Sequence, residues 1–259
     1  MARGEIQIAE HLEELKVTDF PGADAIRDYI IRVTKNVETT VSRGGVVDFS
    51  PKFLEEDNLI LRLAPGSFGG KGRGIAFINT LLQTKELFSG IENVSIKIPK
   101  TAIIGAEEYE NFINRHDLYG IHMEHEFDEV KQIFLSKDLS EELVSKLRVY
   151  LDKITSPLAV RSSGMFEDSI SESFSGIYQT FLIPNNHENL NDRLKNLTDA
   201  IKLVYASIYS KHARSYFEAI NYRIDDERMA VVLQEIVGIK YENIFFPHVS
   251  GVAQSYNFY

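Results

Sequence analysis

Residues 159–176 read AVRSSGMFEDSISESFSG, and this stretch is the most informative part of the chain. Its first residues, Leu158 to Val160, predict a short buried strand, and a polar run follows from Arg161 to Gly176. An arginine placed directly after a buried strand can direct its planar guanidinium into a cleft, where it suits bidentate contact with phosphate. A polar loop in which Arg161 pairs with Glu167 or Asp168 explains the same residues about equally well.

A glycine-rich segment lies about ninety positions upstream, where residues 65–74 read PGSFGGKGRG. We expect a loop here, followed by an apolar helix from Ile75 to Leu82. Glycines let backbone N–H groups approach an anion, and Lys71 would add a point charge for phosphate. The spacing of the Walker A motif is missing, so a flexible turn with exposed charges remains the leading interpretation of this segment alone.

The third motif is the apolar run 231–237, VVLQEIV. A strand that ends in Gln234, Glu235, Ile236 and Val237 could offer backbone groups to an adenine ring. A buried strand with a polar end is the simpler interpretation of this run taken alone.

The bulk properties limit the classes of function. The 259 residues are 44% hydrophobic and 25% charged, as in globular domains, and the formal net charge is -10. An acidic chain disfavours broad binding to nucleic acid. No cysteine is present, which excludes thiolate catalysis and Cys-zinc sites, and no apolar run is long enough for a membrane helix. His122 and His125 lie three apart, but a solvated charged loop is favoured over a shared metal.

Apolar spacing predicts the remaining elements. Helices are expected at 9–15, 23–37, 106–114, 129–135, 140–154 and, as one helix or two, at 189–217. Strands are expected at 46–49, 58–64, 94–104, 178–183, 229–237 and from 249 onward.

The three motifs occur in the order found in one known family. The chain resembles the N-terminal nucleotide-binding domain of phosphoenolpyruvate synthase and pyruvate phosphate dikinase. The matching residues are Gly69-Gly70-Lys71-Gly72, Ile98-Pro99 with Tyr109 and Phe112, Ala159 to Ser163 with Glu167-Asp168, Ser173-Phe174, Gly176, Thr180, Val232 to Val237, Ser250-Gly251-Val252 and Asn257. Ile170, Ile177, Gln254-Ser255 and Phe258 depart from the family's pattern.

The resemblance implies an α+β, ATP-grasp-like nucleotide-binding domain over residues 61–259, preceded by a partly helical N-terminal extension over residues 1–60. The extension is expected to contribute little to nucleotide binding. Lys71 and Arg161 would be the catalytic cations and would face one cleft. The residues implied in binding ATP are Gly69, Gly70, Lys71, Gly72, Arg161, Ser162, Ser173, Gly176, Thr180, Gln234, Glu235 and Val237, with Ser173, Gly176 and Thr180 as a lid.

The family's activity implies a multi-domain, cytoplasmic phosphotransferase that passes a phosphoryl group from ATP to a histidine. The acceptor histidine would lie on a swivelling domain, and a further domain would bind the substrate. Mg²⁺ is implied, with its ligands expected beyond Tyr259. The 259-residue chain alone is therefore expected not to complete phosphoryl transfer. A non-catalytic nucleotide-sensing or assembly module is the alternative, favoured by Ile177 and Gln254-Ser255.

Overall fold

The computed structural model describes residues 20, 22, 25–31, 45–84, 94–165 and 176–253. Residues 25–31 are helical, as expected, whereas the rest of the helices expected at 9–15 and 23–37 lies outside the described residues. Ser173, Glu167 and Asp168 also lie outside them.

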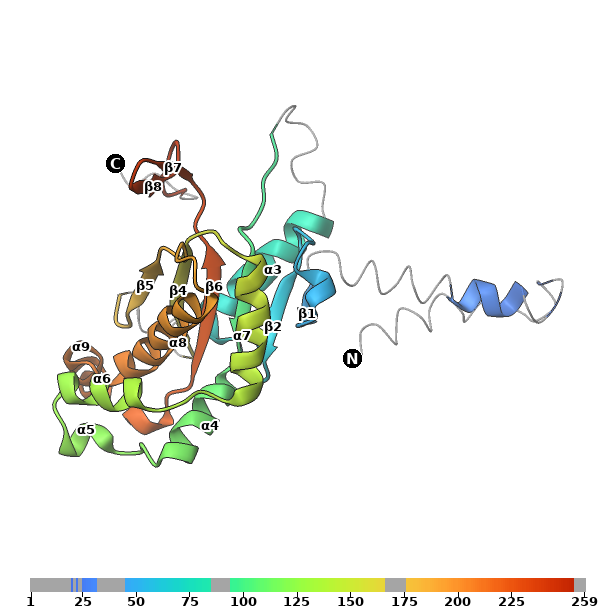
Figure 1. Cartoon of the computed structure of the whole chain (residues 1–259). Helices are drawn as coiled ribbons and strands as arrows, with labels where there is room; N and C mark the ends of the chain where they lie inside the picture. The colour runs from blue at the N-terminus through green and yellow to red at the C-terminus, as the bar shows by residue number, and fades with distance from the viewer. Residues whose placement is uncertain are drawn as a thin grey trace.

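A six-stranded sheet forms the centre of the molecule, in the order β1-β2-β3-β6-β4-β5 (Figure 1). β1, β2 and β3 run parallel, β6 is antiparallel to both β3 and β4, and β5 is antiparallel to β4. The strands are β1 Val46–Asp48, β2 Ile60–Ala64, β3 Thr101–Ile104, β4 Leu158–Gly164, β5 Thr180–Ile183 and β6 Met229–Glu235. The mixed sheet with its helices confirms the α+β class; the ATP-grasp assignment within that class stays a prediction.

Helices cover both faces of the sheet. They are α3 Gly69–Thr84, α4 Ala106–His116, α5 Ile121–Glu124, α6 Phe127–Ser136, α7 Glu141–Lys153, α8 Leu190–Ala206 and α9 Lys211–Ala219, with 3-10 turns at Pro51–Phe53, Ser207–Tyr209 and Ile224–Asp226. α7 and α8 pack together over one face, as Figure 1 shows. α3 packs on the other face, against β4 and β6.

Side chains alternate along β6 and so divide the apolar core into two layers. Val231 and Leu233 belong to the larger cluster, whereas Val232, between them, belongs to a small cluster with Ile60 and Ile103. Phe68, Ile75 and Ala76, at and near the start of α3, pack on that small cluster. Every residue opposite Val232 in the neighbouring strands therefore shares the face that α3 covers.

Hydrogen bonds fix the start of α7 beside α4. The Ser140 hydroxyl accepts from the amide of Leu143 at 3.2 Å, which caps the helix. The buried carboxylate of Glu108 accepts from the Ser140 amide at 2.9 Å and from its hydroxyl at 2.8 Å. These three hydrogen bonds hold the start of α7 against α4.

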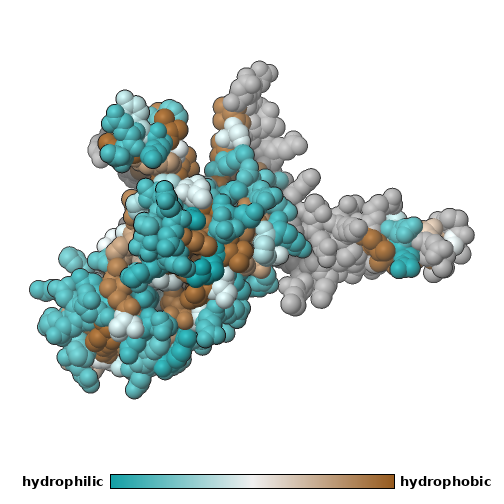
Figure 2. Space-filling model, viewed as in Figure 1, coloured by the Kyte–Doolittle hydropathy of each residue, from teal (hydrophilic) through white to brown (hydrophobic). Residues whose placement is uncertain are grey.

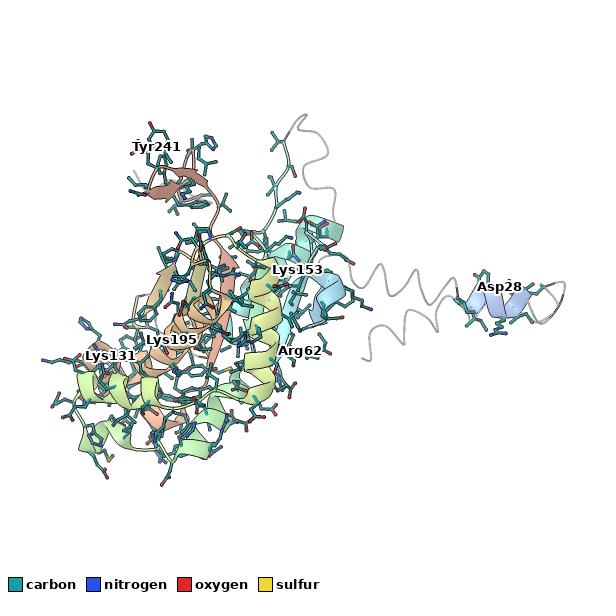
Figure 3. The ribbon with its side chains drawn as sticks, viewed as in Figure 1. Asp28, Arg62, Lys131, Lys153, Lys195 and Tyr241 are labelled. Atoms are coloured by element: carbon teal, nitrogen blue, oxygen red, sulfur yellow. The ribbon has the colours of Figure 1, made fainter. Side chains whose placement is uncertain are left out.

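A two-stranded ribbon, β7 Ile239–Tyr241 with β8 Ile244–Phe246, follows β6. Its register pairs Ile239 with Phe246 and Tyr241 with Ile244, so these four side chains share one face. That face is exposed, and apolar surface is visible on the ribbon in Figure 2. The side chain of Tyr241 stands apart from the main sheet (Figure 3).

Several expected boundaries were wrong. Residues 94–100 have no regular structure, and only Thr101–Ile104 of the expected strand pairs; Pro99 has no N–H to donate to a ladder. The glycine run expected as a loop is the first part of α3, and residues 161–164, expected in a polar loop, extend β4. Residues 249–253 contain no strand, and the remainder of that expected element lies outside the described residues.

That residues 1–60 contribute little to nucleotide binding, in contrast to residues 61–259, stays a prediction. In the sheet, β1 from the first part pairs in parallel with β2 from the second. Residues 46–48 thus belong structurally to the sheet that carries the candidate site.

Candidate functional site

The start of α3 is hydrogen-bonded onto β4. The amide of Gly72 donates to the Ser163 hydroxyl at 3.0 Å, and that hydroxyl donates to the Phe68 carbonyl at 2.6 Å. The Gly69 amide donates to the Ser67 hydroxyl at 3.3 Å. Two segments separated by about ninety residues are therefore joined by one buried serine.

Glycine is required where the helix touches the strand. A Cβ on Gly69 would lie 1.9 Å from the Ser163 carbonyl oxygen, and Gly69 has a φ of +61°. A Cβ on Gly72 would lie 2.9 Å from the Cβ of Phe68. The glycines at these two positions thus serve close helix–strand packing, whatever else they contact.

Lys71, half-buried, follows Gly70 in the first turn of α3. Its Nζ lies 3.5 Å from the Ser162 Oγ, at the long end of hydrogen-bond range. Ser162 is buried and is the neighbour of Arg161 in β4. Ser162 is opposite Val231 of β6, a residue of the larger core cluster, whereas Arg161 is opposite Val232 of the small cluster. The contact of Lys71 with Ser162 therefore brings the lysine to β4 but does not place it on the face of Arg161.

Arg161 lies on the face of the sheet that α3 covers, because it is opposite Val232 of β6 and Thr180 of β5. Its Nη1 donates to the Gln234 Oε1 at 3.1 Å. Within the described part of the chain no carboxylate forms an ion pair with Arg161. Among the described residues, the hydrogen-bond acceptor of the guanidinium is thus a neutral amide.

The predicted adenine edge divides between two faces. Gln234 shares the face of Arg161, whereas Glu235 lies opposite the core residue Leu158 and faces the other way. The amides of Glu235 and Ile236 donate to the carbonyls of Lys100 and Pro157 at 3.0 and 2.9 Å. Val237, 63% exposed, is the first residue of this run whose amide has no backbone partner among the described residues.

The environment of Glu235 makes stability depend on pH. Burial raises the pKa of its carboxyl above 4.5, although Lys100 and a hydrogen bond from Ser156 act in the opposite direction. The folded protein therefore binds this proton more tightly than the unfolded chain does. As pH rises from below 4.5 through the raised pKa, the folded state loses stability relative to the unfolded chain.

Glu235→Gln should remove this dependence, because glutamine stays neutral. We expect the free energy of unfolding of the variant, minus that of the wild type, to be larger at pH 7 than at pH 4. Urea unfolding at both pH values measures this difference. A difference of equal size at the two pH values would contradict this assignment.

The remaining residues predicted for the site lie on β5, before it, and at the start of α3. Thr180 is exposed and directly opposite Arg161, whereas Gly176, with a φ of +80°, is exposed four residues earlier. Gly70 is buried at the start of α3. Ser173, the third residue expected in the lid, lies outside the described residues.

Sequence reasoning missed three residues that shape the site. Ser163 joins α3 to β4, and Thr101 accepts a hydrogen bond from Gln234 Nε2 at 3.2 Å. Glu227, fully buried, accepts from the Met165 amide at 2.8 Å just past β4. Only Ser163 was visible as part of a motif; Thr101 and Glu227 are brought in by strand pairing between distant segments.

The histidines considered for metal binding occupy other roles. The His122 ring stacks on Tyr209 with centroids 5.6 Å apart, and His125 Nδ1 lies 3.3 Å from Glu129 Oε2. No group of three potential metal ligands occurs in the described ranges. A hollow of about 250 Å³ lies beside His122 and Arg214, and none of the predicted site residues lines it.

The described residues also contain no helix with the length and apolarity needed to cross a bilayer.

Comparison with known proteins adds a family to this geometry. The family model "Pyruvate phosphate dikinase, AMP/ATP-binding domain" matches residues 66–258. Phosphoenolpyruvate synthase from Aeropyrum pernix is 30% identical over 89 residues, covering 34% of this chain and 10% of that protein. The uncharacterized phosphotransferase YvkC from Bacillus subtilis is 29% identical over 111 residues, covering 43% of this chain and 12% of that protein. The matches thus span about a tenth of the length of these relatives.

Proposed function

Because this chain belongs to the family of pyruvate phosphate dikinase AMP/ATP-binding domains, we propose that it binds ATP at the junction of α3, β4 and β6 and prepares its phosphates for transfer. One observation carries this proposal. The glycine-rich start of α3 is bonded to Ser163, which lies two residues after Arg161 on the same face of β4.

The residues present fit a polyphosphate. Lys71 supplies a point charge, and Arg161 supplies a planar guanidinium that can contact two oxygens at once. The amides of Gly69 and Gly72 already donate to serine hydroxyls, so an anion would meet the Lys71 side chain and the end of the helix near Gly70. In the proposed site Lys71 and Arg161 neutralise the phosphates, and Ser162 orients the lysine.

The base would lie at the end of β6. We assign it to the backbone of residues 234–237, where the Val237 amide is the first donor not used by the sheet. Thr180 and Gly176, on and before the edge strand β5, would form with Ser173 a lid over the phosphates. The exposed position of Thr180, opposite Arg161, supports this arrangement.

Magnesium has no ligand set in the described part of the chain, where no three acidic or histidine side chains converge. Phosphoryl transfer depends mainly on positioning and charge neutralisation, and the residues described here would contribute the cationic share.

For a longer protein we propose the dikinase type of reaction, with a histidine of a swivelling domain as acceptor and a separate substrate domain. A nucleotide-sensing module is the second candidate. It is supported by Ile177, which packs against the apolar core where the resembling family carries glutamine. In that longer protein, acid-labile label on a histidine after incubation with γ- or β-labelled ATP and Mg²⁺ would favour the enzyme, and binding without label would favour the sensor.

Lys71→Met provides the direct test of the phosphate site. We expect the affinity for ATP to fall about fivefold to tenfold, whereas the affinity for adenosine should be unchanged, because adenosine lacks the charge that the lysine neutralises. Calorimetric titrations with both ligands measure the difference.

Lys153→Met is the matched control, since Lys153 is exposed at the end of α7 (Figure 3). It should leave both affinities unchanged. An equal loss of ATP and adenosine binding in Lys71→Met would show that the lysine supports the fold rather than the phosphates.

A further inference from the structure

A chain of hydrogen bonds crosses three neighbouring strands on the face that α3 covers. The Thr101 hydroxyl donates to the Pro99 carbonyl at 2.7 Å and accepts from Gln234 Nε2 at 3.2 Å. The Gln234 Oε1 then accepts from Arg161 Nη1 at 3.1 Å. The chain thus runs from β3 through β6 to the predicted phosphate-binding arginine of β4.

The groups at the two ends of this series of hydrogen bonds fix which atom donates and which accepts in each bond. An arginine can only donate and a carbonyl can only accept, so the glutamine oxygen must face Arg161 and the threonine proton must face Pro99. The register supports the same arrangement. Thr101 lies directly opposite Gln234, and Arg161 lies opposite Val232, two residues before Gln234 on the same face. Gln234 therefore has one orientation in which both of its neighbours are satisfied.

We propose that Thr101 and Gln234 are positioning residues that hold the Arg161 guanidinium ready for phosphate. The inference rests on the proposed function, in which Arg161 binds the phosphates of ATP. It gives the Gln234 side chain a task separate from the adenine edge, which uses backbone groups. Buried Thr101, 3% exposed, would act on the nucleotide only through Gln234 and Arg161.

The physical gain is preorganisation. A free arginine side chain samples many rotamers and loses that freedom on binding an anion. A side chain already held by a neutral acceptor loses less, and a neutral acceptor does not compete with phosphate for charge as a carboxylate would. Glutamine thus suits this position better than glutamate.

A double-mutant cycle on the full 259-residue chain tests the inference, with ATP affinity measured by calorimetry. Thr101→Val removes the hydroxyl at nearly constant volume and should weaken ATP binding about fivefold. Arg161→Ala should weaken it at least tenfold. The double variant should bind like Arg161→Ala alone, because Thr101 has no route to the nucleotide without the arginine.

Two further variants separate positioning from general stability. Thr101→Ser keeps the hydroxyl and should retain affinity within about twofold. Thr198→Val is the matched control. The Thr198 hydroxyl donates to the backbone carbonyl of Lys195 within α8, which packs on the other face of the sheet. This change should leave the affinity for ATP unchanged.

The outcomes distinguish the inference from the proposed function. Losses that add in the double variant, or no loss in Thr101→Val, would overturn the positioning role alone. Wild-type affinity in Arg161→Ala would overturn both. Should Thr101→Val not fold by circular dichroism, Gln234→Met replaces it in the same cycle, because methionine keeps the length of the side chain and lacks both amide groups.

Discussion

Gly69→Ala is expected to destabilise the protein by at least about 3 kcal/mol and to abolish ATP binding. The new Cβ would lie 1.9 Å from the Ser163 carbonyl oxygen and 2.6 Å from its hydroxyl oxygen, so backbone must move. Alanine also disfavours the φ of +61° that Gly69 adopts. Movement of α3 away from β4 would break the bond from Gly72 to Ser163 and displace Lys71.

Two other glycines of the same helix provide a graded control. Gly74 has no atom within 4 Å of an added Cβ, so Gly74→Ala should stabilise the helix by about 0.5–1 kcal/mol. Gly72→Ala should fall between, because its nearest contacts are side-chain atoms at 2.9 and 3.4 Å. Urea unfolding of the three variants gives this order; a Gly69→Ala protein as stable as Gly74→Ala would contradict the packing described here.

Arg161→Ala is expected to reduce ATP affinity by about 10- to 100-fold without unfolding the domain. The charged head is half-buried and donates to a neutral amide, so its removal leaves no buried charge without a partner. The loss should increase through the series adenosine, AMP, ADP and ATP as the number of phosphates increases. It should shrink with added salt, since screening weakens charge interactions at an accessible site.

Arg62→Ala is the matched control within the same sheet. Arg62 lies on β2 (Figure 3). Its Nε is 2.6 Å from Asp48 Oδ1 in an exposed ion pair. Loss of such a pair costs about 0–1 kcal/mol of stability and should not alter nucleotide affinity. If Arg161→Ala weakened adenosine and ATP equally, Arg161 would have a role in the fold and not at phosphate.

The sequence and the structure agree best where periodicity is strong. The strands at 60–64 and 229–235 and the helices α4, α6 and α7 were expected within a few residues, because their apolar spacing repeats over several turns or pairs. The short helix α5 was not expected. The glycine run was misjudged, since glycines predict loops locally. Here contact with Ser163 compensates for their low helix propensity.

The candidate site likewise contains residues that the sequence indicates and residues that it does not. Lys71, Arg161 and Gln234 could be selected from the sequence, because each stands in a short motif of distinctive composition. Thr101 and Glu227 could not, because neither belongs to such a motif. Their contacts with Gln234 and Met165 follow from strand pairing and chain reversal between distant segments.

The sequence by itself determined the α+β class, the family and the three motifs, since composition, apolar period and motif order are properties of the chain as written. The tertiary structure alone decided which side chains meet. Antiparallel pairing of β6 with β3 and β4 aligns Thr101, Gln234 and Arg161 on one face, and turns Glu235 to the other. Such alignment depends on strand register, which arises from packing of the whole sheet and from no local property of any one segment.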